Sequence, residues 1–154
     1  MLRAGQSKGD IGSVPTEVIL QVFADRVMVL VTQLGKVGAL IQASLPANSS
    51  FDDLVRDAVD ELGEPAQDSG YPSLPPPPAS ITLMPVLGAS GDQPLLSLYA
   101  SQIATLVWAA ESGPLGAGAS RPVIVGLALK GGGTEDPKEF RGIMSLVREV
   151  LQRE

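Results

Sequence analysis

The feature that most constrains this chain is a pair of apolar stretches without polar alternation, residues 27–31 (VMVLV) and 123–129 (VIVGLAL). Their β-branched residues favour strands. A strand with one face in water alternates apolar and polar side chains, and these two do not. Both faces of these strands must therefore be covered, either by the chain's own helices or by another protein, because valine and leucine left in water would form a large apolar patch.

Further strand signals surround these two stretches. Turns at 24–26 and 35–38 would join the first three strands into an antiparallel meander. In the fourth strand Pro85 requires a sheet edge or a bulge, because proline cannot donate a hydrogen bond to a neighbouring strand. The expected strands are residues 16–23, 27–34, 39–43, 81–88 and 122–130.

Two main helices are expected. The first, at 94–110, contains no charged residue. The second, at 137–152, has one apolar side and Asp136 as its N-cap. A short amphipathic helix at 51–62 would lie inside a long insertion that ends in a run of four prolines.

Together these elements predict an α+β fold: a largely antiparallel sheet of five to six strands packed with two main helices, plus a short helix in a long inserted loop. A length of 154 residues suits one domain. Residues 1–13 are small and polar, so we expect a disordered tail there. Residues 14–154 would form a single domain with a Pro-rich, acidic insertion at 46–80.

Composition excludes several classes of function. The chain has no histidine and no cysteine, which removes imidazole bases, thiolate nucleophiles and the usual zinc ligands. A net charge of −6 without a basic cluster argues against nucleic acid and acidic membranes as partners. The longest uncharged apolar stretch, 93–110, is too short to span a bilayer. Without a secretory signal pattern we expect a cytoplasmic protein, with the nucleus as a further location.

Three motifs partly match known binding sites, but each lacks features that such a site requires. GKVG at 35–38 lacks the spacing of a phosphate-binding loop and its hydroxyl residue. KGGGTEDP at 130–137 links a strand to a helix, but Glu135 and Asp136 stand where a bound anion would lie. The acidic residues of 52–61 lack EF-hand spacing and indicate a solvated helix face or a docking surface for a basic partner. We expect no enzyme, no catalytic residue, no cofactor and no metal.

The uncharged helix at 94–110 has an unusual second side. A helical wheel places Trp108 opposite the leucine-rich stripe, among small side chains. The small residues around it are Ser97, Ser101, Ala104 and Thr105. Small hydroxyls around one aromatic ring are typical of a protein interface. Either another element of the same chain or a partner protein would cover this side, and the sequence leaves both open.

The segment VPTEVILQVFADRVMVLVTQLGKVGALI, residues 14–41, resembles the proteasome assembly chaperone 3 family, and the similarity continues more weakly through 85–107, 122–130 and the last helix. The insertion at 46–80 departs from the family's compact form. The resemblance implies a non-enzymatic chaperone that pairs with a related small chaperone or with itself, holds proteasome α-type subunits during α-ring formation, and then leaves. The expected partner-binding residues are Gly35, Lys36, Val37, Gly38, Asp92, Gln93, Ser101, Thr105 and Trp108.

A second hypothesis assumes the same fold but different protein partners. A longin-like or roadblock-like adaptor in membrane traffic also dimerises through a small sheet-and-helix domain. Nucleotide binding at 130–137 is a more remote third option.

Overall fold

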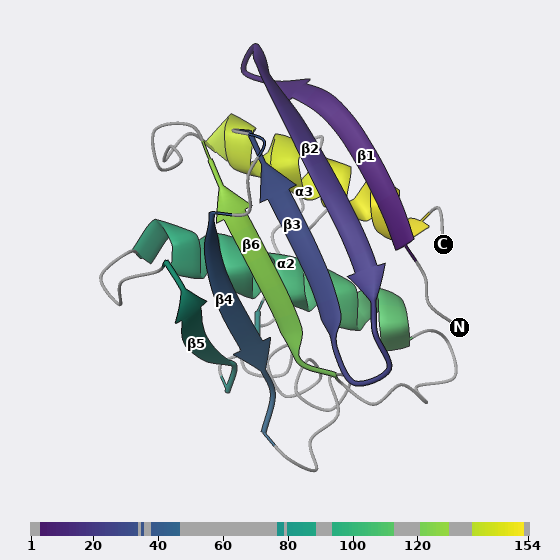
Figure 1. The fold of residues 1–154 in the computed structure, drawn as a ribbon, viewed down its shortest axis with the longest axis vertical. Helices are drawn as coiled ribbons and strands as arrows, with labels where there is room; N and C mark the ends of the chain where they lie inside the picture. Colours follow the sequence, from purple (N-terminus) through teal and green to yellow (C-terminus); the bar gives the residue numbers. More distant parts are fainter. Residues whose placement is uncertain are drawn as a thin grey trace, which may run out of the picture.

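The structure, a computed structural model, describes residues 4–33, 35, 38–46, 77–78, 80–88, 94–112, 121–129 and 137–152. These residues contain six strands and two helices (Figure 1). The strands are β1 (Ala4–Ile11), β2 (Val14–Val22), β3 (Val27–Thr32), β4 (Ala39–Ser44), β5 (Thr82–Leu87) and β6 (Val123–Ala128). The helices are α2 (Pro94–Ser112) and α3 (Pro137–Gln152). The short helix predicted at 51–62 lies outside the described residues.

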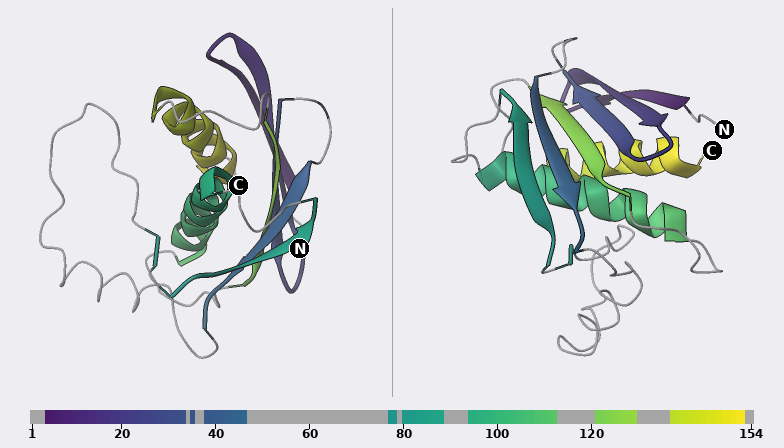
Figure 2. Two further views of the ribbon diagram at one scale, coloured as in Figure 1. Left: turned by 90° about the vertical axis from the view of Figure 1, so that its left-hand side faces the viewer. Right: turned by 60° about the horizontal axis from the view of Figure 1, so that its bottom comes forward.

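The six strands form one mixed sheet in the order β1-β2-β3-β6-β4-β5. β3 and β6 pair in parallel, and every other neighbouring pair is antiparallel. Both helices lie against the same face of the sheet, so the described elements form two layers (Figure 2). The predicted α+β fold, with a largely antiparallel sheet and two main helices, is confirmed.

The core lies between the sheet and the helices. Alternate residues of the central strands face it, such as Val29 of β3 and Val125 of β6, and both are fully buried or nearly so. Residues 102–108 of α2 are buried around the whole circumference of the helix, which accounts for the lack of charge in that segment. Full burial of each large aliphatic side chain contributes about 1.5–3 kcal/mol.

One part of the predicted topology is wrong. We expected the strands at 16–23, 27–34 and 39–43 to form an antiparallel meander with a hairpin turn at 35–38. Instead β6 lies between β3 and β4, parallel to the first and antiparallel to the second. A strand that is apolar on both faces buries most at the centre of a sheet, and this outweighs pairing between sequence neighbours.

The connection from β3 to β4 consequently passes over the carboxyl end of β6. The backbone N–H of Gln33 donates to the carbonyl oxygen of Ala128 at 2.8 Å. Gly38 lies against the same end of β6 with φ of +71°, and a Cβ there would stand 2.7 Å from the Cβ of Ala128. Position 38 therefore requires glycine for its backbone conformation and for space.

The predicted disordered tail at 1–13 is also wrong, because Ala4–Ile11 forms β1 and pairs along its whole length with β2. Its small residues allow α3 to approach closely: a Cβ on Gly9 would meet the Leu146 side chain at 3.1 Å. Ser7 is buried, and its hydroxyl donates to the Glu149 carboxylate at 3.0 Å. Small, polar composition therefore marks a tight strand–helix contact here and not an absence of structure.

Candidate functional site

The sheet face opposite the helices, which we call the open face, is not covered by either described helix. Figure 1 looks onto this face, and the side view in Figure 2 shows α2 and α3 together on the other side. Side chains alternate between the two faces along each strand, so residues next to the buried core positions point to the open face. The five large apolar side chains that do so on the inner strands form what we call the open-face cluster. They are Ile19, Met28, Leu30, Leu40 and Ile124, and each is partly exposed.

The strand register places this cluster in two adjacent rows across the sheet. The first row runs from Ile19 through Leu30, Gly126 and Leu40 to Leu87. The second row runs from Gln21 through Met28, Ile124 and Gln42 to Met84. Directly opposed side chains in such rows stand about 5 Å apart and pack against each other. The open face is thus a continuous, mostly apolar surface across the four middle strands.

The chemistry of this surface favours burial by another apolar surface. The strands β3, β4, β5 and β6 contain no charged residue. A hollow of about 510 Å³ lies where β1, β2 and the end of β3 meet, and its lining includes the charged residues Lys8, Asp10 and Glu17. Within the described ranges, no group of acidic residues is placed to hold a metal ion. Among the helices that the structure describes, none is long and apolar enough to cross a membrane.

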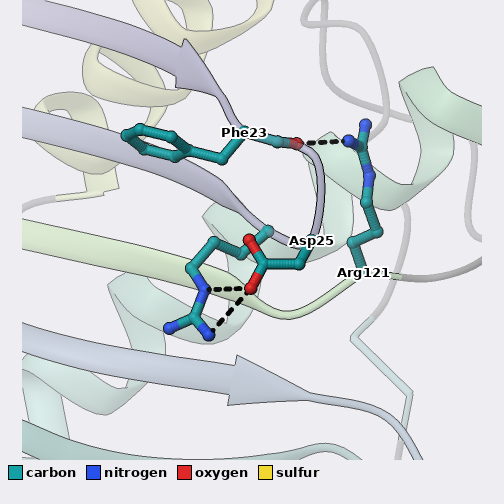
Figure 3. A network of polar contacts seen from close by, with 4 residues as sticks. Phe23, Asp25 and Arg121 are labelled. Atoms are coloured by element: carbon teal, nitrogen blue, oxygen red, sulfur yellow. Dashed lines mark hydrogen bonds and ion pairs between the residues drawn. The ribbon is translucent and has the colours of Figure 1, made fainter.

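A second polar feature holds the β2–β3 turn in place (Figure 3). The Arg121 guanidinium donates to the carbonyl oxygen of Phe23 at 2.7 Å. It also forms an ion pair with Glu111 near the end of α2. The indole N–H of Trp108 donates to the Arg121 carbonyl oxygen at 2.7 Å. These contacts join the turn, the helix and the start of β6, and they place Trp108 in a structural role.

The turn itself contains a weaker ion pair, between Arg26 and Asp25 at 3.1 Å. The hydrogen bond from Arg26 lowers the pKa of Asp25. Both side chains are well exposed, so the pair adds little to stability.

The predicted partner-binding residues fall into three groups. Trp108 and Thr105 are buried by their own chain, at 1% and 0% exposure, so the chain itself covers this side of the helix. Ser101 and Thr105 donate to backbone oxygens one turn earlier, at 2.8 and 2.7 Å. Gly35 and Gly38 are exposed in the β3–β4 connection, on a different part of the chain from the helix residues. Lys36, Val37, Asp92 and Gln93 lie outside the described residues.

The open-face cluster was not among those predicted residues. The signal for it was the lack of polar alternation in 27–31 and 123–129, which required a cover on both faces. That pattern does not say which face the helices take. The expected contact at Trp108 came from a different signal, the lack of charge on the helix at 94–110.

Replacing Arg121 tests whether its contacts with Phe23 and Glu111 stabilise the fold. Arg121→Met is expected to lower the free energy of unfolding by about 1–3 kcal/mol, because a part-buried Glu111 carboxylate loses its partner. Arg26→Met removes an exposed, solvent-screened ion pair and should lower the free energy of unfolding much less than Arg121→Met does. Urea unfolding followed by Trp108 fluorescence measures both. Equal losses in the two variants would contradict the role given to Arg121.

Comparisons with known proteins give one family match and one similar fold. A family model described as "Proteasome assembly chaperone 3" matches residues 29–150. A search of curated proteins finds no match. Among solved structures, a chain from a crystal structure of a chaperone complex for yeast 20S proteasome assembly is similar, with a TM-score of 0.60 and 14% identity over 97% of this chain and 98% of that one. At such low identity the structural likeness shows the fold alone.

Proposed function

The chain belongs to the proteasome assembly chaperone 3 family, and from this premise we propose that it pairs through its open face with a related small chaperone and holds α-type subunits while the α-ring of the core particle forms. The family match spans most of the chain: it includes β4, β5, α2 and β6 whole, and most of β3 and α3. Proteasome assembly is therefore the process in which the chain acts.

The observation that carries the pairing is the open-face cluster. The helices cover one face of the sheet, and Met28, Leu30 and Ile124 remain partly exposed on the other. Covering each such side chain contributes up to about 1.5–3 kcal/mol, against a cost of association of roughly 4–15 kcal/mol. A sheet face of this kind is stable in water when a second apolar surface packs on it.

Support for the client comes from relatives. The similar yeast chain belongs to a complex for 20S proteasome assembly. A chaperone that holds α-type subunits during ring formation and then departs performs binding and release, and no bond is made or broken. Such a role needs contacts that a later subunit can displace. We place this role in the cytoplasm and the nucleus, which cell fractionation would check.

Purification of the tagged chain from its own cells tests the proposal. Native mass spectrometry is expected to show a second small chaperone in one-to-one ratio, together with α-type subunits and without mature core particle. Recovery of trafficking GTPases or coat components in their place would support the adaptor alternative and overturn the proposal.

A further inference from the structure

We infer that the pair interface is displaced toward the edge strand β5 and stops short of β1, so that the partner presents an uncharged, apolar sheet face to β3, β6, β4 and β5. This inference rests on the proposed pairing and adds its footprint and chemistry. It makes β5 a contact strand and leaves the outer part of β1 in water.

Exposed apolar side chains are concentrated on β5. Met84, Val86 and Leu87 are 52%, 49% and 63% exposed. The other exposed large apolar residues in the described part of the chain are Phe23, at the β2–β3 turn, and Leu98, on α2. Three such residues on a six-residue edge strand form an apolar patch that a soluble protein normally covers.

The register makes this patch continuous with the open-face cluster. Met84 ends the row that contains Met28 and Ile124, and Leu87 ends the row that contains Leu30 and Leu40. A register shift leaves Val86 as an extra residue, because Leu40 pairs with Leu87 while Ile41 pairs with Pro85. Bulges of this kind redirect side chains at sheet edges. One apolar surface therefore extends from the centre of the sheet to this edge.

The opposite edge of the sheet, formed by β1 beside β2, is charged and polar. The only charged residues in the six strands are Lys8 and Asp10 of β1 and Glu17 of β2. Lys8 and Glu17 are directly opposed, and the Gln6 amide donates to the Glu17 carboxylate. Burial of these charged groups under an apolar partner would be costly. The charged edge at β1 and β2 is thus suited to the solvated rim of an interface, and the apolar edge at β5 is suited to its interior.

Pro85 restricts how the partner can lie on β5. Proline has no backbone N–H, so an added strand would miss a hydrogen bond in the middle of this edge. The shift at Leu40 and Ile41 further disturbs the regular pattern that strand addition needs. The partner is therefore expected to pack its side chains on the face of the sheet and not to extend the sheet.

Charge substitutions at the two ends of one row test this footprint. The row that runs from Gln21 to Met84 extends by one more residue to Ala4 on β1, because Ala4 pairs with Gln21. Ala4 and Met84 therefore lie at the two opposite ends of this row. Both residues are exposed edge positions, so Met84→Asp and Ala4→Asp introduce the same charge at matched sites. The probe is the small chaperone recovered with the tagged chain, and calorimetry gives its Kd for each variant.

Met84→Asp is expected to raise Kd at least about tenfold, and Ala4→Asp to change it by less than about twofold. Leu87→Asp, at the end of the neighbouring row, serves as a second variant if Met84→Asp lowers the melting temperature. Equal effects at the two edges, or a larger effect of Ala4→Asp, would overturn the inference while the pairing stands. If a charge at Leu30 in the centre also leaves Kd unchanged, or if no small chaperone is recovered, the proposed pairing fails and the footprint with it.

Discussion

Leu30→Asp is expected to abolish pairing while the chain stays folded. Leu30 lies in the middle of the open face, with Ile19 opposite it on β2 and Gly126 on β6. In the free chain the new carboxylate would be partly exposed to water, and in the pair it would be buried without a partner charge. An uncompensated buried charge costs about 3–5 kcal/mol, which raises Kd at least about 100-fold.

The matched control is Leu98→Asp on α2, which adds the same charge at an exposed leucine in the helical layer. It should leave the Kd for the small chaperone within about twofold of the unchanged chain. Circular dichroism and the melting temperature confirm that both variants fold. Wild-type affinity of a folded Leu30→Asp chain would mean that the open face is not the pairing surface.

Gly38→Ala is expected to cause the largest loss of stability among alanine substitutions at the glycines whose surroundings the structure describes. The new Cβ would meet the carbonyl oxygen of Leu127 and stand 2.7 Å from the Cβ of Ala128, so the connection would have to move away from β6. We expect a loss of at least about 3 kcal/mol in the free energy of unfolding, from overpacking added to the cost of a positive φ.

Gly35→Ala separates the cost of the positive φ from the cost of overpacking. Gly35 has φ of +69°, close to the +71° of Gly38, but nothing lies within 4 Å of its added Cβ. Its loss should be only about 1–2 kcal/mol, the cost of a left-handed conformation for alanine. Urea unfolding measures both variants. Similar losses would show that the β3–β4 connection does not press against the end of β6.

Much of the local structure follows from residue patterns. Alternation of β-branched residues predicts β2, and the Asp-Pro start with its apolar stripe predicts α3 within a residue or two. Pro85 predicts a sheet edge or a bulge, and β5 is an edge strand with a register shift next to Pro85. These features depend on neighbours in the sequence, so periodicity and turn chemistry are sufficient to find them.

The arrangement of the strands depends on contacts between distant residues, which the pattern does not encode. Nothing near Gly38 in the sequence indicates that β6, about 90 residues later, lies next to it. The strand β1 was missed because its glycines and serine resemble a tail, although their small size is what α3 needs.

The environment of Trp108 could not be predicted from its neighbours in the sequence. The apolar residues of 27–31 indicate that both faces of the strand need a cover, and the described helices cover one of them (Figure 2). Trp108 seemed the better contact residue because lone aromatics among small hydroxyls are common at interfaces. Its indole N–H instead donates to the backbone oxygen of Arg121, 13 residues later in the same chain. Residue composition alone cannot distinguish these two environments.

Oxidation of the methionines in the free and paired chain tests the central claim most directly. Met28 belongs to the open-face cluster and is partly exposed, whereas Met144 is buried on α3 at 1% exposure and serves as the internal control. Pairing with the small chaperone should lower the oxidation rate of Met28 at least about tenfold, because an interface core excludes water, and leave Met144 slow in both states. An unchanged rate at Met28 in the isolated pair would contradict burial of this face by the partner.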